Sequence, residues 1–356
     1  MINFKEYALS DRELKRYEDL DKEYMMLADD PDNCIPKFVM PVYPSFIPTW
    51  EEMMKDPETM LHAQLDGLKM SRWLGDDTVM GVRSEFGTPT VASAFGCDLF
   101  YPVNNLPCCR NHILRTKEDV WNVKKPSISC ETYSKVKAWT EAYKKVLPEG
   151  YHIMMSDIQG PFNNAHVIRG TDIFTDMYDD PEVFDKLMDV VTDATIEYAR
   201  AQRKWTNAED GWQYDWGAKW KGNARISNCS LHMIGKELYE KQVRKYDERF
   251  LKQLGGGRMH YCGTPKGIVE TLAAIPGMTG VDYDSLFLDM QELMDAVPKN
   301  IVLLQALSLT SLEGMKILES RKWPFKKRNV IFRLRGPLNR YDAKNIYRKF
   351  RSIAEA

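Results

Sequence analysis

The sequence predicts an α/β protein that folds as one (β/α)8 TIM barrel. Short apolar runs typical of strands alternate along its 356 residues with longer segments that have the apolar spacing of helices. Parallel strands need crossover helices between them, and an α/β barrel commonly uses this length of chain as one domain. A doubly wound open sheet is the competing fold. The eight expected strands are Phe38–Pro44, Thr78–Arg83, His152–Ile158, Trp212–Trp216, Arg258–Gly263, Thr279–Tyr283, Ile301–Ala306 and Val330–Leu334.

Start and stop signals place several of the helices between these runs. Pro181 follows Asp180, which combines an N-cap acceptor with a residue whose φ suits the first helical turn. Thr310 and Glu313 have the spacing of a capping box. The glycines at 255–257 precede a strand, so they indicate a helix stop rather than a phosphate-binding loop.

Two stretches lie outside the simple repeat of strand and helix. Residues 1–35 are expected to form an N-terminal helical extension, which leaves 36–356 for the barrel. Gly87–Arg115 is a long insertion after the second strand. Insertions of this kind usually cover the C-terminal mouth of a barrel, where its functional site lies.

The nearly balanced charge hides an asymmetry along the chain. Lys and Arg number 49 against 51 Asp and Glu, yet residues 321–356 hold twelve basic residues against Asp342 and Glu355, a net charge of +10. This basic tail is either a solvated terminal helix on an acidic body or a surface for an anionic ligand or an acidic partner. The overall charge argues against nucleic-acid binding.

Composition also indicates the compartment. No apolar run approaches the roughly 18 residues that span a bilayer, and the charged N-terminus is unlike a signal peptide. The seven cysteines are an odd number scattered through a large chain, which suits free thiols in a reducing environment. We therefore expect a cytoplasmic protein that does not bind a membrane.

If the fold is a barrel, side chains two residues apart at strand ends point together into the mouth. His260 and Cys262 form such a pair at the end of the fifth strand, and imidazole with thiolate is half of a zinc site. Core packing is the alternative for an isolated pair. Asp282 and Asp284 follow the sixth strand in the same spacing. They could complete a metal shell, act as general acid and base, or cap the next helix.

The ends of other strands carry residues that could line a binding site. Arg333 and Arg335 share one face at the end of the eighth strand and could hold a carboxylate, with ion pairing to acidic neighbours as the alternative. The second strand ends with Arg83 and Glu85. The fourth ends with Asp215 and Trp216.

The third strand is followed by an unusually polar segment, SDIQGPFNNAHVIRG. It contains Asp157, the amides Asn163 and Asn164, and His166. Asn163 could simply cap the following helix, and His166 could be a surface residue. No P-loop, G-x-G-x-x-G unit, G-x-S-x-G elbow or H-E-x-x-H is present.

These residues resemble the uroporphyrinogen decarboxylase superfamily. The similarity rests on GPFNNAHVIRG, the Asp-Pro-Glu helix after it, SNCSLHMIGKELYEKQVRKYDERFLKQL and MHYCG, and it extends over roughly residues 35–350. It implies a TIM barrel. Decarboxylases of the superfamily carry an arginine-rich N-terminal signature, but Pro41 and Ser45 stand at its arginine positions. The catalytic Asp of those enzymes falls near Ser84, and their Tyr falls near His166 or Val167.

The other branch of the superfamily consists of zinc-dependent corrinoid methyltransferases, whose signature is H-x-C with a second Cys further on. His260 and Cys262 match the first half, whereas the second Cys position falls on Pro337. The resemblance implies zinc bound by His260, Cys262 and a carboxylate of Asp282 or Asp284. Such a zinc would convert an incoming thiol to a thiolate that takes a methyl group from a corrinoid carried by a partner protein.

Two other functions remain open at the sequence level. One is a metal-independent decarboxylase or lyase for a carboxylated, tetrapyrrole-like substrate. Arg333 and Arg335 would anchor its carboxylate, and Glu85, Asp157 or His166 would handle the proton. The other is a barrel that binds a corrinoid or tetrapyrrole without catalysis. In each case the partner is a small molecule, and a homodimer is one assembly the chain could form.

Overall fold

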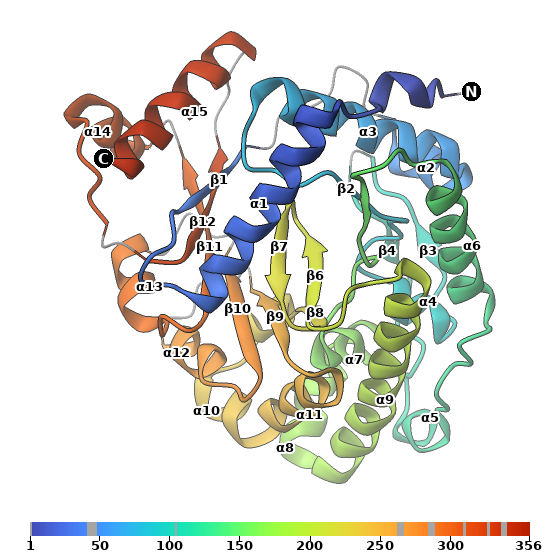
Figure 1. Ribbon diagram of the computed structural model, residues 1–356. Helices are drawn as coiled ribbons and strands as arrows, with labels where there is room; N and C mark the ends of the chain where they lie inside the picture. The colour runs from blue at the N-terminus through green and yellow to red at the C-terminus, as the bar shows by residue number, and fades with distance from the viewer. Residues whose placement is uncertain are drawn as a thin grey trace.

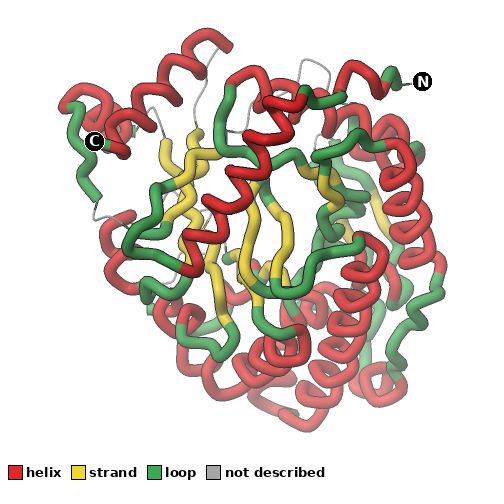
Figure 2. The backbone as a smooth tube through the Cα atoms, viewed as in Figure 1, coloured by secondary structure: helices red, strands yellow, loops and turns green. Residues whose placement is uncertain are grey.

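The computed structural model describes residues 2–40, 48–103, 105–261, 267–283, 289–308, 311–325, 328–335 and 340–356. Strands lie at the centre of the molecule and helices surround them (Figures 1 and 2). Within the described residues, a parallel six-stranded sheet has the order β1-β12-β11-β10-β9-β8. Its strands are β1 (Lys37–Val39), β8 (Ala224–Ser227), β9 (Gly257–His260), β10 (Met278–Tyr283), β11 (Val302–Ser308) and β12 (Val330–Arg335).

Two further strand segments join the ends of this sheet, which supports the predicted TIM barrel. The amide of Asp77, just before β2, donates to the carbonyl of Phe38 in β1 at 3.1 Å. β2 pairs in parallel with β5. The segment after β5 reaches β8, where the amide of Gly160 donates to the carbonyl of Ser227 at 2.7 Å. The described backbone hydrogen bonds therefore run round a ring of eight strands. The two added strands are β2 (Gly81–Val82) and β5 (His152–Ile153).

The prediction that Trp212–Trp216 is the fourth barrel strand is wrong. This run forms β6 (Trp212–Asp215), which pairs antiparallel with β7 (Ala218–Lys221) in a separate hairpin. Trp216 and Gly217 have φ of 50° and 72°, so the chain reverses at once instead of continuing into a crossover helix. The fourth barrel strand is β8, which follows the hairpin.

Helices surround the strands, and their ends partly follow the expected signals. Asp180 caps the longest of them by accepting the Val183 amide, as predicted. The stop after Leu254 is also confirmed, because Gly255 has a φ of 78°. The described cap of α14 is Ser311, whose hydroxyl accepts the Gly314 amide at 3.1 Å, and the expected cap Thr310 lies outside the described residues. These outer helices are α2 (Trp50–Lys55), α3 (Pro57–Leu74), α5 (Lys117–Asn122), α6 (Glu131–Val146), α7 (Pro161–Arg169), α8 (Asp172–Asp179), α9 (Pro181–Thr206), α10 (Lys236–Leu238), the π-helical turn η3 (Tyr239–Val243), α11 (Arg244–Leu254), α12 (Ile268–Ala273), α13 (Met290–Ala296), α14 (Leu312–Ser320) and α15 (Arg340–Glu355).

The predicted N-terminal extension is helical and covers the N-terminal ends of the barrel strands. Lys37 at the start of β1 pairs with Glu23 of α1. The hydroxyl of Tyr24 in α1 donates to the carbonyl of Asp77 at 2.6 Å. In Figure 1 this helix runs alongside the β6–β7 hairpin, which it contacts at β7. The extension consists of η1 (Phe4–Tyr7) and α1 (Asp11–Asp29).

The predicted insertion after β2 contains a short helix and a small antiparallel hairpin. Leu99 pairs with Cys109, and Phe100 with Cys108. The elements of the insertion are α4 (Thr90–Ala94), β3 (Leu99–Phe100) and β4 (Cys108–Cys109).

Among the described residues, none of the helices combines the length and the apolar content that crossing a bilayer requires.

Alternation along the strands separates an outer apolar core from the barrel interior. Met259, Val281 and Phe332 belong to the large cluster between strands and helices. Ile331 and Leu304 belong to a smaller cluster with β7 and α1 that fills the N-terminal end of the barrel. Residues of alternate positions on β8, β9, β10 and β12 therefore face the interior, and many of them are charged.

Candidate functional site in the barrel interior

The β6–β7 hairpin carries its tip into the barrel. The amide of Val79, next to β2, donates to the carbonyl of Gly217 at 2.9 Å. A Cβ added to Gly217 would lie 3.2 Å from Val39 of β1 and 3.1 Å from Thr78, which shortly precedes β2. The indole nitrogen of Trp220 donates to the carbonyl of Asp215 at 3.0 Å, which fixes the turn. Asp215 and Trp216 reach the interior from this hairpin, not from a strand end as predicted.

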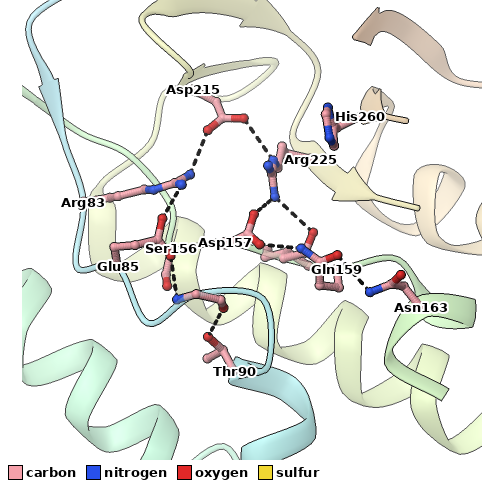
Figure 3. Close-up of polar contacts among 12 residues, drawn as sticks. Arg83, Glu85, Thr90, Ser156, Asp157, Gln159, Asn163, Asp215, Arg225 and His260 are labelled. Atoms are coloured by element: carbon pink, nitrogen blue, oxygen red, sulfur yellow. Dashed lines mark hydrogen bonds and ion pairs between the residues drawn. The ribbon is translucent and has the colours of Figure 1, made fainter. Parts of the chain in front are cut away.

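Asp215 is the centre of a buried ion-pair network. Its Oδ1 lies 3.1 Å from Nη1 of Arg83, and its Oδ2 lies 3.0 Å from Nε of Arg225 and pairs with Arg258. Figure 3 shows Asp215 between Arg83 and Arg225. Asp215, Arg225 and Arg258 are each at most 3% exposed. One carboxylate therefore holds three guanidinium groups, which come from three different barrel strands or their ends.

Each of these arginines has a second carboxylate partner. Arg83 pairs with Glu85, Arg225 pairs with Asp157, and Nη1 of Arg258 lies 2.6 Å from Oδ2 of Asp282. Buried charges are tolerated only when they are paired, so the network is internally compensated. It forms a rigid polar layer across the interior whose members cannot move independently.

The rings of Trp216 and Trp220 lie against guanidinium groups of this site. The guanidinium of Arg333 lies 4.6 Å from the ring centre of Trp216. The guanidinium of Arg258 lies 5.7 Å from the ring centre of Trp216 and 4.6 Å from the ring centre of Trp220. The ring centroids of Trp216 and His260 are 4.9 Å apart. Cation–π contacts of this kind are strengthened by desolvation. Trp216 therefore contacts both Arg333 and His260.

His260 is held by a carboxylate. Its Nδ1 lies 3.1 Å from Oδ1 of Asp282, on the neighbouring strand in direct register. Burial alone would raise the pKa of Asp282, but His260 and Arg258 outweigh burial and hold that pKa below its ordinary value. Asp282 is therefore a carboxylate at neutral pH. A histidine whose Nδ1 faces a carboxylate presents Nε2 to a ligand, the arrangement common for metal-binding histidines.

The expected metal ligands are only partly described. Cys262, Asp284 and Pro337 lie outside the described residues. No group of three His, Cys, Asp or Glu side chains in the described ranges could hold a metal ion. Both oxygens of Asp282 already face a partner, Arg258 or His260, so it is better placed to orient His260 than to bind a metal directly.

A second polar chain leads from the network to His166. Gln159 donates to Asp157, and Nδ2 of Asn163 donates to Oε1 of Gln159 at 2.9 Å. Ser230 donates to Oδ1 of Asn163 at 2.7 Å, and Nδ1 of His166 lies 2.9 Å from Oγ of Ser230. Burial lowers the pKa of the half-buried His166, and neighbouring histidines add to this effect. Figure 3 shows the first part of this chain, from Asp157 to Asn163.

The structure brings most of the sequence-predicted residues into one site. Arg83, Glu85, Asp157, Asn163, Asp215, Trp216, His260, Asp282 and Arg333 contact one another or share a partner. Arg335 lies at the end of β12, two residues beyond Arg333 on the same strand. Asn164 instead faces away, because its Nδ2 donates to the carbonyl of Gln159 and to the hydroxyl of Thr195 in α9.

Four members of the site were missed at the sequence level: Arg225, Arg258, Gln159 and Ser230. Arg225 and Arg258 stand two residues before Ser227 and His260 in apolar strands. Their alternation with buried apolar residues is the signal that could have placed them inside the barrel. Ser230 follows β8 in the 3-10 helix η2 (Cys229–Met233), and no local pattern marks it.

Polar side chains gathered inside a parallel barrel, toward the carboxyl ends of its strands, define an α/β-barrel enzyme of the kind in which loops and strand ends form the site. Comparison with known proteins identifies the family. The model of the uroporphyrinogen decarboxylase (URO-D) family matches residues 47–307, so the chain belongs to that family.

Two relatives and one solved structure refine this assignment. Methylcobamide:CoM methyltransferase MtbA of Methanosarcina acetivorans is 26% identical over 72% of this chain and 74% of the relative. The protein of the same name from Methanosarcina mazei is 28% identical over 67% of this chain and 68% of the relative. A solved methyltransferase from Methanosarcina mazei has a TM-score of 0.70 at 16% identity and covers 94% of this chain and 98% of its own. The relatives support an assignment to the methyltransferase branch of the superfamily, and the solved structure supports the barrel fold.

Proposed function

We propose that this protein transfers a methyl group between a methylated corrinoid and a thiol. The observation that carries the proposal is the orientation of His260 by Asp282 at the end of β9, two residues before Cys262. The relatives named methylcobamide:CoM methyltransferase support the same chemistry. A corrinoid protein is the proposed partner, as in the sequence-level expectation.

Zinc is the proposed metal, with His260 Nε2 and Cys262 as ligands. The described residues fit this role in one respect, since the carboxylate of Asp282 lies 3.1 Å from Nδ1 of His260, as is common for metal-binding histidines. Zinc at this position would lower the pKa of a thiol that binds to it. The substrate thiol and a further donor would complete the shell that Pro337 leaves short of one cysteine.

The chain's own residues position the reactants around this point. Arg258 holds Asp282 in place, and the network centred on Asp215 holds Arg258. Trp216 packs beside His260 and under Arg333, so its ring forms an apolar wall that excludes water from the reacting sulfur. Arg333 is placed to bind an anionic group at the far end of the thiol substrate.

The test combines metal analysis with a methyl-transfer assay. Purified without chelator, the wild type should contain about one zinc per chain, and it should convert methylcobalamin and 2-mercaptoethanesulfonate to cob(I)alamin and the methyl thioether. Cys262→Ala should lose both the zinc and the activity. Cys130→Ala, which changes a half-buried cysteine at the start of α6, should lose neither.

Two results would contradict the zinc site or the methyl transfer. A metal-free wild type with full methyl transfer would remove zinc from the mechanism. A preparation that transfers no methyl group but releases carbon dioxide from a carboxylated tetrapyrrole would establish the decarboxylase alternative instead.

A further inference from the structure

One continuous polar chain connects the two histidines of the site. From His260 it passes through Asp282, Arg258 and Asp215 to Arg225 and Asp157. From Asp157 it continues through Gln159, Asn163 and Ser230 to His166. Both histidines enter this chain through Nδ1.

The carboxylate of Asp157 sets the direction of every hydrogen bond on the His166 side. A carboxylate only accepts, so the amide of Gln159 must turn its Nε2 toward Asp157 and its Oε1 toward Asn163. Asn163 then donates through Nδ2 to Gln159 and turns Oδ1 toward Ser230. This assignment does not depend on how the two amides were oriented, because the opposite orientation would bring acceptor against acceptor.

The hydrogen bonds of Ser230 determine which nitrogen of His166 carries the proton. Its amide and its hydroxyl both donate to Oδ1 of Asn163, at 2.9 and 2.7 Å. A serine hydroxyl has one proton, so toward His166 its oxygen can only accept. Nδ1 of His166 therefore carries the proton of the neutral ring, and Nε2 carries the lone pair.

The position and surroundings of His166 suit a proton acceptor. It lies on α7, which follows the third strand segment of the barrel, and Ser230 lies on η2, which follows β8. The amide of Asn228, at the start of η2, donates to the carbonyl of His260 at 2.9 Å, so both histidines lie at the same end of the barrel. Burial lowers the pKa of His166, and His112 and His232, the titratable side chains that act on it from the neighbouring segments, lower it further.

We infer that His166 Nε2 accepts the proton of the substrate thiol, and that Ser230 and Asn163 are positioning residues that hold His166 in the tautomer this step requires. This inference rests on the proposed function. The S–H bond breaks, its electron pair stays on sulfur, and its proton moves to Nε2. The sulfur then takes the methyl group from the corrinoid, which keeps the electron pair of the Co–C bond. The proton of the imidazolium is released to water.

The tautomer can be tested without any assay of activity. In histidine-labelled protein, long-range 1H–15N spectra distinguish a protonated Nδ1 from a protonated Nε2, and His166→Gln assigns the signal. We expect Nδ1–H in the wild type and in Ser230→Thr, which keeps the hydroxyl. Ser230→Ala should shift His166 toward the Nε2–H tautomer, whereas Ser134→Ala on α6 should leave it unchanged. A wild-type Nε2–H signal, or no change in Ser230→Ala, would overturn the positioning role.

The role in the reaction is tested by kinetics. His166→Gln should lower kcat about 100-fold, and Ser230→Ala should move the acidic limb of the kcat profile while Ser230→Thr restores it. A wild type that transfers no methyl group, but shows the Nδ1–H tautomer, would refute the proposed function and leave the positioning intact. An active wild type whose His166→Gln variant keeps its rate would refute the proton transfer itself.

Discussion

Gly160 shows how closely single residues are packed around the site. It ends the third strand segment and caps α7, and its φ of −63° is open to any residue. A Cβ at this position would lie 1.8 Å from Oδ1 and 2.5 Å from Cγ of Asn228. Asn228 is fully buried and donates to Asp247 at 2.9 Å, so it has nowhere to move. Glycine is required here by a neighbouring side chain rather than by backbone conformation.

We therefore expect Gly160→Ala to lower the free energy of unfolding by about 3 kcal/mol or more, through overpacking. It should also displace Ser230 and so reduce methyl transfer. Gly67→Ala is the matched control, because nothing lies within 4 Å of a Cβ added there in α3. That change should stabilise the protein by about 0.5–1 kcal/mol, since alanine has the higher helix propensity. Urea unfolding of both variants measures the pair, and equal effects of the same sign would contradict this account.

At the scale of elements, the β6–β7 hairpin separates what the sequence could predict from what it could not. Strands β9 to β12 were predicted closely, because their apolar runs are bounded by helical patterns and turn residues. Trp212–Asp215 was also correctly predicted as a strand, yet its partner was not. Alternation of apolar and polar residues indicates a strand but not the strand it pairs with. The positive φ of Trp216, which reverses the chain, cannot be predicted from the residue type.

The same limit explains the residues missed in the site. Arg225 and Arg258 lie inside strands, and a charged residue in an apolar run has no visible partner in the sequence. Their partner Asp215 comes from the hairpin, which only the fold brings into the barrel. The histidine and carboxylate pairs at strand ends could be predicted, because alternation alone places them on one face.

Asp215→Asn tests the importance of the hairpin tip. The amide leaves three guanidinium groups, of which those of Arg225 and Arg258 are buried, without the charge that they share, and removing one partner of a buried ion pair typically costs about 3–5 kcal/mol. We expect a clear drop in the free energy of unfolding, measured by urea denaturation. Asp32→Asn removes the exposed pair with Lys299 and should have no measurable effect. A stable Asp215→Asn variant would show that the network is not held by the hairpin.

At the scale of the whole molecule, Asp77 joins the two ends of the chain to the barrel. Its Oδ2 accepts the amide of Phe38 in β1 at 2.8 Å, and its carbonyl accepts the hydroxyl of Tyr24 in α1. Its Oδ1 lies 2.6 Å from Nη1 of Arg351 in α15. The basic terminal helix is thus attached at least in part by a specific ion pair, and Phe350 is fully buried on the same helix. Both ends of the chain are thus tied to the segment that leads into β2.

The buried carboxyl group of Asp247 makes the stability of the folded protein depend on pH. Burial raises the pKa of Asp247 to about 7, although Asn228 and Tyr239 donate hydrogen bonds that favour its ionised form. Its Oδ1 has no hydrogen-bond partner among the described residues, which suits a protonated group. The folded protein therefore keeps a proton that the unfolded chain releases at its ordinary pKa of 3.8. This group favours the folded state most below pH 4, and its contribution is lost between pH 4 and 7.

Asp247→Asn should remove this contribution, because an amide resembles the protonated acid and does not titrate. With a pKa raised from 3.8 to about 7, the loss in the wild type amounts to at most about 4 kcal/mol. Relative to the wild type, Asp247→Asn should therefore gain stability as the pH rises from 4 to 7 and show a constant difference above 7. Urea unfolding at a series of pH values measures this difference. A difference that stays constant across the series, or falls, would show that Asp247 is ionised in the folded protein.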